Sequence, residues 1–454
     1  MHKLKFTLKQ HTPLIHFQHD QAGATLRATE LKPKLDHYLI KSLFKNDFDS
    51  FKTFLIGYST NTEVELLEKF QEGKTALNYK LRIRSVSSAF FKIGYPKKKK
   101  SGEIYWDPQI PCFFGNMGIN DSLKLKQFVF DKEDIECDII VSDSILAKQF
   151  ENAEKTFCSF FLKNNFGNRQ DKGFGSFTIK KFNGRPTNFK IPNCLFFRIN
   201  KKEILEERFN QLLNINGYDT EEKIDWLGKY YSLFEAIDLF YRTLRGGINI
   251  PGRLYFKSLM FFYAKNLETE QQWDKKTIRK FFYSEHPNYE EILRNRVEPE
   301  GTVQYSPEDD DSDKLLFRDL LGLASEQSWR YYDEDTITKV AFDESGEELQ
   351  RFKSPITFKP VLQSDGFKIY ILLDRIPLKY LSSSMEINSS KYGKEEPLIL
   401  SIPDSFSLSE YLKWAINFYQ SHKRNISNKT PTQSNEMDII DDIYYQLNQQ
   451  ITEE

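Results

Sequence analysis

The segment NNFGNRQDKGFGSF, residues 164–177, combines glycines with cations and aromatic side chains in a pattern that could bind phosphate. Glycine permits positive φ and lets another backbone come close, and successive free N–H groups in such a loop form a binding site for anions. Arg169 and Lys172 add full charge, while Phe174 could stack on a base or anchor the loop. The segment also fits a helix end followed by a turn, and it lacks the flanking pattern of a Rossmann or Walker motif. Two interpretations stay open, a phosphate-binding loop and an ordinary turn.

A second basic cluster occurs in YRTLRGGINIPGRLYFKS, residues 241–258. Arg242, Arg245 and Arg253 flank glycines there, at the expected end of one helix and the start of the next. The start of the second helix would offer free N–H groups to a phosphate. Cations at a helix C-terminus are also ordinary partners of the helix dipole. Both interpretations fit this pattern.

Histidines bear on whether the protein could cleave RNA without a metal, because an imidazole near its ordinary pKa can act as a general base on a ribose 2′-OH. His16 and His37, both near the N-terminus, are the candidates for that role. Exposed or hydrogen-bonded histidines explain the same residues, and their spacing matches no metal signature. The acidic run at 308–311 lies in a Pro-containing stretch and indicates a solvated linker. The sequence therefore predicts no metal or other cofactor.

Composition limits the class of protein. The 454 residues carry 64 Lys+Arg against 65 Asp+Glu, and 39% of them are hydrophobic. That apolar fraction supports a substantial core and excludes general disorder, while a net charge of −1 confines any nucleic-acid site to a local patch. Four cysteines without a CxxC pair suit reduced thiols, and no apolar run reaches the roughly 18 residues of a membrane helix. We expect a soluble cytoplasmic protein with no membrane contact.

Hydrophobic periodicity predicts the elements that would position these residues. Residues 3–10, KLKFTLKQ, alternate strictly, as a half-buried strand does. Residues 28–44 have leucines at every fourth position and predict a helix, and Pro33 argues for a start near residues 31–32. A helix over 144–163 leads into the glycine-rich segment, and a strand follows it. This order of strands and helices indicates an α+β fold.

The character of the sequence changes along the chain and predicts five parts. Residues 1–200 form an α+β domain that holds the glycine-rich segment. Residues 201–300 follow as a helical insert, with helices over 202–216, 223–245, 254–267 and 273–283. Residues 301–313 are an acidic linker. Residues 314–425 return to strands as a C-terminal α+β domain, and residues 426–454 are a polar, flexible tail.

Several stretches together resemble the RAMP superfamily, the repeat-associated RNA-binding subunits of CRISPR systems. FTLKQHTPLIHF…GATLRATELKPKL, within residues 6–35, is similar to that family's opening strand and first helix. CFFGNMG, residues 112–118, is similar to its short FG-containing segment, and GNRQDKGFGSF, residues 167–177, resembles its glycine-rich loop. RFKSPITFKPV, residues 351–361, resembles a recurrent C-terminal strand that opens on Ser-Pro.

The resemblance implies ferredoxin-like (RAMP/RRM-like) modules with a helical insertion. It also implies a non-catalytic subunit that binds guide RNA in a type III, Cmr- or Csm-like, effector complex of antiviral defence. Its partners would be CRISPR RNA and the other subunits. A metal-independent endoribonuclease that processes CRISPR RNA is the alternative. Together with the basic clusters, the resemblance places the expected RNA contacts at Arg27, Lys32, Lys34, Arg169, Lys172, Gly173, Phe174, Gly175, Arg242, Arg245 and Arg253.

Overall fold

The structure is a computed structural model, and the chain forms two compact units within it. The first unit comprises residues 1–194, 198–234 and 358–372, and the second comprises residues 195–197, 235–357 and 373–454. Both units combine helices with antiparallel sheets, which confirms the α+β class. The residues that the structure describes are 1–15, 26–85, 88–92, 95–98, 104–107, 127–131, 133–187, 193–200, 221–250, 254–265, 274–289, 316–323, 325–329, 332–343, 345–349, 353–429 and 435–452.

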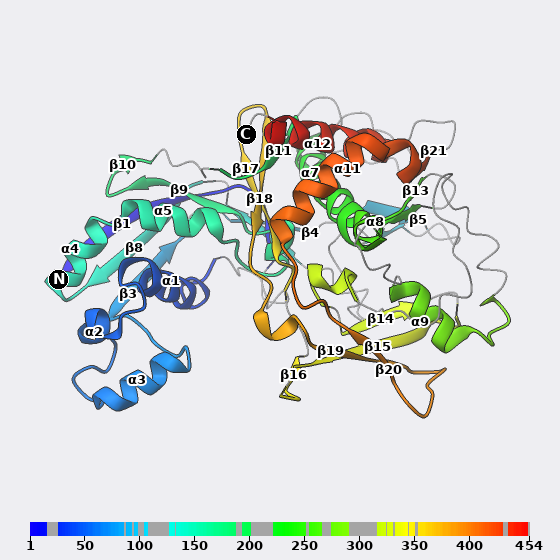
Figure 1. Cartoon of the computed structure of the whole chain (residues 1–454). Coiled ribbons are helices and arrows are strands. Elements are labelled where there is room, and N and C mark those ends of the chain that lie inside the picture. The colour runs from blue at the N-terminus through cyan, green and yellow to red at the C-terminus, as the bar shows by residue number, and fades with distance from the viewer. Residues whose placement is uncertain are drawn as a thin grey trace. The chain divides into compact units, whose positions relative to one another are not determined.

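The main sheet of the first unit contains β1 (His2–Gln10), β3 (Tyr79–Arg84), β8 (Ile135–Val141), β9 (Phe177–Phe182) and β10 (Arg185–Pro186). All neighbouring strands are antiparallel, in the order β10–β9–β1–β8–β3 (Figure 1). The strand predicted over residues 3–10 is thus confirmed as the central strand β1. Its Leu4, Phe6 and Leu8 are buried, and Lys3, Lys5 and Lys9 are exposed, because successive side chains point to opposite faces.

Helices α1 (Ala28–Leu43), α4 (Ser144–Glu151) and α5 (Glu154–Lys163) pack against one face of this sheet. Aromatic rings fill the interface, and Phe6 contacts both Phe157 and Phe161. The expected start of the first helix near residues 31–32 is wrong, because α1 begins at residue 28 and contains Pro33. Pro33 removes a hydrogen bond only to the carbonyl of Thr29, which lies in the exposed first turn where water can replace it. The single helix expected over 144–163 is two helices.

Smaller elements complete the first unit. β2 (Leu14–Ile15), β7 (Gln127–Asp131) and β4 (Ser88–Lys92) form one sheet, and β5 (Tyr95–Lys98) pairs with β6 (Ile104–Asp107). Between β1 and β3 lie α2 (Phe48–Phe51), the 3₁₀ turn η1 (Lys52–Phe54) and α3 (Glu63–Gln71). Late in the chain, residues 358–372 return to the first unit through β17 (Ile356–Leu362) and β18 (Gly366–Leu373), which form a sheet with β11 (Phe196–Asn200).

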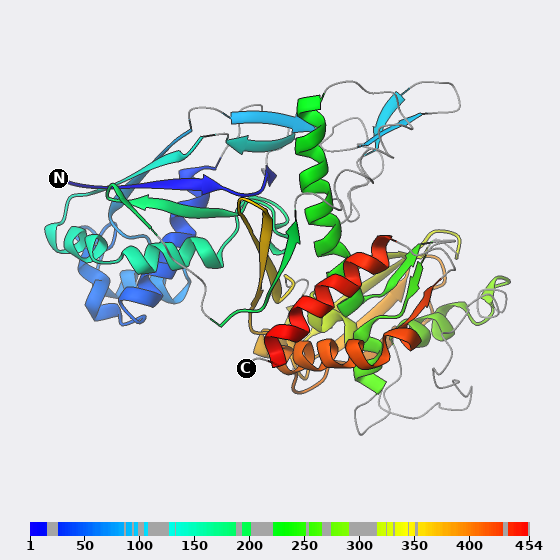
Figure 2. The same ribbon diagram turned by 90° about the horizontal axis from the view of Figure 1, so that it is seen from above.

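The second unit contains two further sheets. One follows the order β14 (Glu326–Trp329), β15 (Asp335–Phe342), β19 (Ser384–Ser389) and β20 (Leu398–Ser401), with β16 (Glu348–Leu349) paired to β15. The other contains β12 (Ile248–Ile250), β13 (Leu254–Phe256) and β21 (Ser427–Lys429). Helices α11 (Leu408–Ile426) and α12 (Asn435–Thr452) lie side by side (Figure 2). The remaining elements are α7 (Glu221–Arg245), which extends from one unit into the other, α8 (Leu259–Lys265), α9 (Asp274–Tyr283), and the 3₁₀ turns η4 (Arg318–Leu321) and η5 (Leu378–Tyr380).

Two local expectations for the second unit differ from the structure. The helix predicted over 254–267 begins instead as strand β13, because residues 254–256 pair with both β12 and β21. The stretch 426–454, expected as a flexible tail, contains α12, whose Ile440, Ile443 and Leu447 are buried. The apolar residues of this polar segment gather on one face of the helix, and that face packs on α11. The division into five parts stays a prediction, and its acidic linker, 301–313, lies outside the described residues.

Candidate nucleic-acid interface

The glycine loop, defined here as residues 164–176, connects α5 to β9 and closes on itself. Asn165 and Ser176 form an isolated antiparallel bridge, and the Phe166 N–H donates to the Gly175 carbonyl at 3.0 Å. Phe166 and Phe174 are fully buried, and the Phe174 ring stacks on Phe234 at a centroid distance of 3.9 Å. Of the two roles considered for these rings, anchoring the loop is therefore the one they have, because a buried stacked ring is not available to a base.

Two glycines of the loop occupy backbone conformations that other residues rarely adopt. Gly167 has φ +77° and Gly175 has φ +61°. A Cβ atom built on Gly167 would lie 2.4 Å from the Ile15 carbonyl oxygen, and one on Gly175 would lie 2.0 Å from the Phe166 carbonyl oxygen. Both the torsion and the close approach of another backbone therefore require glycine at these positions.

The segment that follows β1, residues 11–15 and called here the N-terminal segment, forms hydrogen bonds with the loop. The Asn168 N–H donates to the Ile15 carbonyl at 2.7 Å, and the Gly175 N–H donates to the Pro13 carbonyl at 2.8 Å. The Thr12 hydroxyl donates to the Gly173 carbonyl at 2.6 Å. Residues 12–15 and the glycine loop, although far apart in the sequence, are thus joined by hydrogen bonds.

The loop's own N–H groups are largely committed to acceptors of the protein. The Ser176 N–H also donates to the N-terminal segment, to the Thr12 hydroxyl at 2.9 Å. The Gly167 N–H donates to the Glu30 carboxylate at 2.6 Å, so an anionic group of α1 already occupies that position. Positive charge that this loop offers to a ligand must therefore come from side chains rather than from an open nest of N–H groups.

A buried lysine of β17 supports the loop from within the first unit. Lys359 Nζ donates to the Asn164 carbonyl at 2.9 Å, to Asn165 Oδ1 at 3.1 Å and to the Phe177 carbonyl at 2.9 Å. Burial lowers the pKa of Lys359 well below its usual value. Lys359 was not among the predicted residues, although it lies inside the Ser-Pro strand that contributed to the family resemblance. Its contacts fix both ends of the loop.

His11 is a second buried group under the loop that was not predicted. Its Nδ1 accepts the Leu362 N–H at 3.1 Å, and its Nε2 lies 2.7 Å from the Thr178 hydroxyl. An accepting Nδ1 places the proton of a neutral ring on Nε2, which then donates to Thr178. Burial, followed by the charges of Lys359 and Lys9, lowers the pKa of His11 well below its usual value. Both nitrogens are thus used structurally, and His11 is not positioned as a general base.

The state of His11 predicts a pH dependence of stability. The pKa of His11 is lower in the folded protein than in the unfolded chain, where it is about 6.5, so the unfolded chain binds the proton more tightly. The free energy of unfolding should therefore fall as the pH decreases below about 6.5, until the folded pKa is passed. His11→Asn, which keeps an acceptor near the Nδ1 position, should show a weaker fall between pH 7 and pH 5. Urea unfolding at several pH values measures this, and equal slopes in both proteins would contradict it.

The predicted RNA contacts on the glycine loop lie in different environments. Arg169 is half-buried at φ +57°, and its guanidinium has no hydrogen-bond acceptor within the described part of the chain. The Lys172 side chain is only 9% exposed and lies 3.1 Å from the Asp171 carboxylate. Gly173, next to it, is buried in a left-handed conformation. Arg169 is therefore the cation of this loop best placed to meet a ligand.

Helix α1 brings one predicted lysine to the glycine loop. Lys34 Nζ donates to Gln170 Oε1 at 2.9 Å and lies 5.2 Å from the centre of the Phe166 ring. Lys32 instead pairs with Asp36 at 2.7 Å and donates to the Leu77 carbonyl at 2.9 Å. Arg27 occupies the N-cap position of α1 and is half-buried. Lys34 thus contacts the glycine loop directly, through Gln170.

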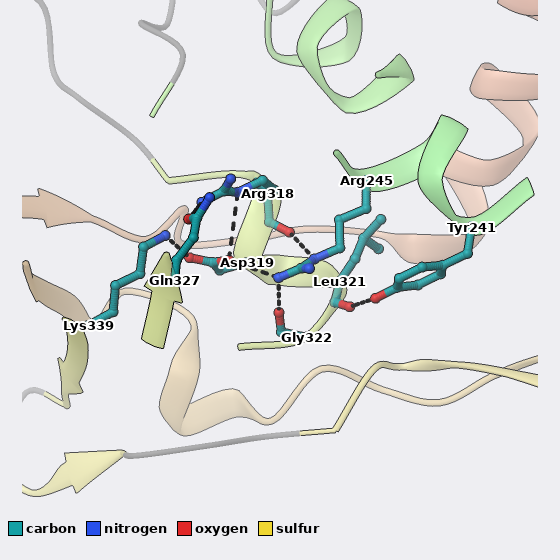
Figure 3. Close-up of polar contacts among 8 residues, drawn as sticks. All are labelled: Tyr241, Arg245, Arg318, Asp319, Leu321, Gly322, Gln327 and Lys339. Carbon is teal, nitrogen blue, oxygen red and sulfur yellow. Dashed lines mark hydrogen bonds and ion pairs between the residues drawn. The ribbon is translucent and has the colours of Figure 1, made fainter. Parts of the chain in front are cut away.

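Of the predicted arginines of the second cluster, Arg242 and Arg245 lie in the second unit, and Arg245 belongs to a charge cluster around Asp319 (Figure 3). Arg245 Nη2 lies 3.1 Å from Asp319 Oδ1 and donates to the Gly322 carbonyl at 2.7 Å. Lys339 Nζ reaches the other carboxylate oxygen at 2.6 Å. The cation is thus used in a tertiary ion pair. Arg242 lies 3.5 Å from the Asp238 carboxylate, and Arg253 lies outside the described residues.

Of the two histidine candidates, the structure describes His37. His37 is exposed on α1, and His16 lies outside the described residues, as does the CFFGNMG segment. Within the described part of the chain, no three His, Cys, Asp or Glu side chains gather as a metal site requires. The described helices include none with the length and apolarity to span a membrane.

Comparisons with known proteins gave matches along most of the chain. A model of the Cmr1 N-terminal domain matches residues 1–248, and a model of the Cmr1 C-terminal domain matches residues 255–442. A search of curated proteins found no match. Two solved structures of type III-B Cmr-beta bound to cognate target RNA, one of them also with AMPPnP and in the presence of ssDNA, contain chains that are 12% identical. The alignments cover 92% and 91% of this chain and 98% and 99% of those chains, with TM-scores of 0.28 and 0.29, too low to establish a shared fold.

Proposed function

The chain belongs to the Cmr1 family, since the N-terminal family model covers more than half of it, and on this premise we propose that it binds guide RNA without cleaving it. The membership confirms the resemblance to a RAMP subunit of a type III, Cmr-like, effector complex. Its partners would then be CRISPR RNA and the other subunits of the complex. The observation that carries the proposal is the match over residues 1–248, because that range contains the whole glycine loop and the N-terminal segment that holds it.

The topology of the first unit supports a ferredoxin-like module in this proposal. Taken along the chain, its long strands are β1, β3, β8 and β9, and their order in the sheet is β9–β1–β8–β3. Helices α1 to α3 lie between β1 and β3, and α4 and α5 lie between β8 and β9. This is the order of two split βαβ halves, each with its helices crossing from one strand to the next.

The geometry of the glycine loop supports a role in which a loop of fixed conformation presents a cation to the ligand. Hydrogen bonds with Lys359 and with the N-terminal segment fix the conformation of the loop. Little conformational entropy would therefore be lost when the loop binds a ligand. Arg169 belongs to this loop, and its guanidinium can donate two parallel hydrogen bonds to a phosphate. We place the RNA backbone at Arg169, with Lys34 nearby. The fixed ring of His11 favours binding over catalysis, because neither nitrogen is available to accept a proton from RNA.

The proposal is tested by expressing the protein together with its genomic neighbours, purifying it by a tag and sequencing any bound RNA. Small RNAs that share a repeat-derived 5′ tag are the expected result. If no RNA is recovered even with the neighbours present, the proposed function is wrong. Incubating the purified protein with a repeat transcript, with and without EDTA, tests the non-catalytic role. Cleavage that leaves a cyclic phosphate would support the endoribonuclease alternative instead.

The loop contact gives a prediction of its own. Arg169→Asn removes the guanidinium but keeps a residue that tolerates positive φ, and we expect it to weaken the affinity for the recovered RNA about tenfold, the value of one charge-assisted contact. Lys163→Ala, which removes an exposed cation at the end of α5, is the matched control and should leave the affinity within about twofold. Filter binding measures both. Equal affinities for Arg169→Asn and wild type would move the RNA contact away from the loop.

A further inference from the structure

Among the elements that the structure describes, the helices that pack on the main sheet of the first unit lie on one of its two faces. Helices α1, α4 and α5 pack on the face formed by Leu4, Phe6 and the other buried residues of the strands. The alternate residues of the same strands point to the other side, which we call the open face. Its positions are half-buried or exposed on β1, β3 and β9. On the neighbouring strand β8, Glu136 is exposed and Ile140 half-buried, while Asp138 is buried.

The strand register shows that cations dominate the open face. One row across the sheet contains Lys80, Ile140 and Lys3, the next contains Arg82, Asp138 and Lys5, and a third contains Arg84, Glu136, Thr7 and Lys181. Lys9 and Thr178 form a fourth row. The carboxylates are confined to β8, and both neighbouring strands carry a cation at almost every outward position. Because alternate residues of a strand are about 6.6 Å apart, the cations on β1 and β3 form two parallel lines.

Only part of this charge is neutralised within the protein. Lys3 and Arg84 lie 3.0 and 2.9 Å from the Asp138 carboxylate, and Arg84 also contacts Glu136. The other cations of the rows are exposed and have no carboxylate partner within the described part of the chain. They are Lys5, Lys9, Lys80, Arg82 and Lys181. Like charges gathered on one surface repel one another, so this arrangement costs stability unless an anionic partner binds.

We propose that the open face binds the phosphate backbone of single-stranded RNA, independently of base sequence, as a second contact surface besides the glycine loop. The inference rests on the proposed function in that RNA is the ligand. Lines of cations at a regular spacing match a chain of phosphates, and each phosphate that they neutralise releases counterions. The described open-face positions of the rows carry no aromatic side chain on which a base could stack, so this surface would not read bases.

An acidic protein is the other kind of partner that such a charge could attract. Protein interfaces have an apolar, largely uncharged centre. The centre of the open face is instead Asp138 with its flanking Lys5 and Arg82, and Ile140 is the apolar residue in the rows. Charge complementarity without an apolar centre fits a nucleic acid better than a protein surface.

The test measures the binding of a fluorescein-labelled oligouridine to the full chain by polarisation, at several KCl concentrations. Oligouridine has no repeat-derived sequence and reports backbone contacts. In the face variant, Lys5, Lys9, Lys80, Arg82 and Lys181 are replaced by glutamine. In the matched control, Lys41, Lys45, Lys148, Lys155 and Lys163 are replaced by glutamine, which removes the same charge from exposed positions of the helical side. Circular dichroism verifies that both variants are folded.

We expect the face variant to bind more than about tenfold more weakly at low salt and to lose about 0.7 in the slope of log affinity against log salt for each phosphate contact removed. The control should remain within about twofold of wild type. Equal losses in both variants, or none in the face variant while wild type binds, would overturn the inference and leave the proposed function intact. If wild type binds neither oligouridine nor co-expressed RNA, the proposed function fails as well. A face variant that binds RNA normally but no longer assembles with the co-expressed neighbours would identify a protein-binding surface instead.

Discussion

Replacing Gly175 with alanine should lower the free energy of unfolding by about 3 kcal/mol or more and abolish RNA binding through the glycine loop. The new Cβ would stand 2.0 Å from the Phe166 carbonyl oxygen at a φ of +61°, so the backbone has to move. Movement there breaks the bond from the Phe166 N–H to Gly175 and the bond from the Gly175 N–H to Pro13. Leaving buried backbone groups without partners costs about 1–3 kcal/mol each.

Gly184→Ala is the matched control for this variant. Gly184 also has a positive φ, +80°, but an added Cβ would meet nothing within 4 Å. Its cost should therefore be the conformational part alone, about 1 kcal/mol, with unchanged RNA binding. Urea unfolding and filter binding measure the two effects on the same samples. If both variants lose equal stability, the loop tolerates a side chain at Gly175, and its close packing is not what fixes Arg169.

Asp319→Asn should lower the stability of the second unit by about 3–5 kcal/mol, because it leaves buried cations without their anion. The side chains of Asp319 and Lys339 are each only 2% exposed, and Arg245 and Arg318 complete the cluster (Figure 3). Burial acts to raise the pKa of Asp319, but the charge of Lys339, followed by those of Arg318 and Arg245, lowers it to about 2. The carboxylate is therefore strongly stabilised by its partners.

The exposed pair of Lys353 and Asp374 provides the control, with a distance of 2.8 Å and side chains that are 74% and 52% exposed. Asp374→Asn removes the same kind of carboxylate and should change stability by a small fraction of the effect at Asp319, since water screens surface pairs. Hydrogen exchange in β15 during urea unfolding assigns the loss to the second unit. Similar effects of the two substitutions would show that burial of the Asp319 cluster does not matter.

The same cluster predicts a response to acid whose sign is set by the lowered pKa. The pKa of Asp319 is lower in the folded protein than in the unfolded chain, so its contribution to stability is complete above about pH 4. This contribution should be lost as the pH falls toward 2, when the folded carboxyl also takes up a proton. Wild type should lose stability over that interval more steeply than Asp319→Asn. Parallel curves would place the acid sensitivity elsewhere in the chain.

The sequence by itself determined the features that depend on local pattern and on motif. Alternation identified β1, since the period of a strand decides which of its side chains are buried, and leucine spacing identified α1. The motifs around Thr12, the glycine loop and the Ser-Pro strand identified the RAMP resemblance, which the family match confirms. The open face could also have been found, because Lys3, Lys5 and Lys9 alternate with the buried residues of β1. What was missing was the register that places Arg82 and Lys181 in the same rows.

Only the tertiary structure decided which polar groups form hydrogen bonds or ion pairs with one another. Lys359 supports the glycine loop from 195 positions away, and Arg245, expected to face RNA, is used by Asp319 at a separation of 74 positions. The sequence left two roles for Phe174, stacking on a base and anchoring the loop, and its stacking on Phe234 assigns the second. Periodicity reports which face of an element is apolar, but a buried charge or donor is satisfied by whichever segment the chain brings beside it. That partner depends on how distant elements pack, and no local pattern contains it.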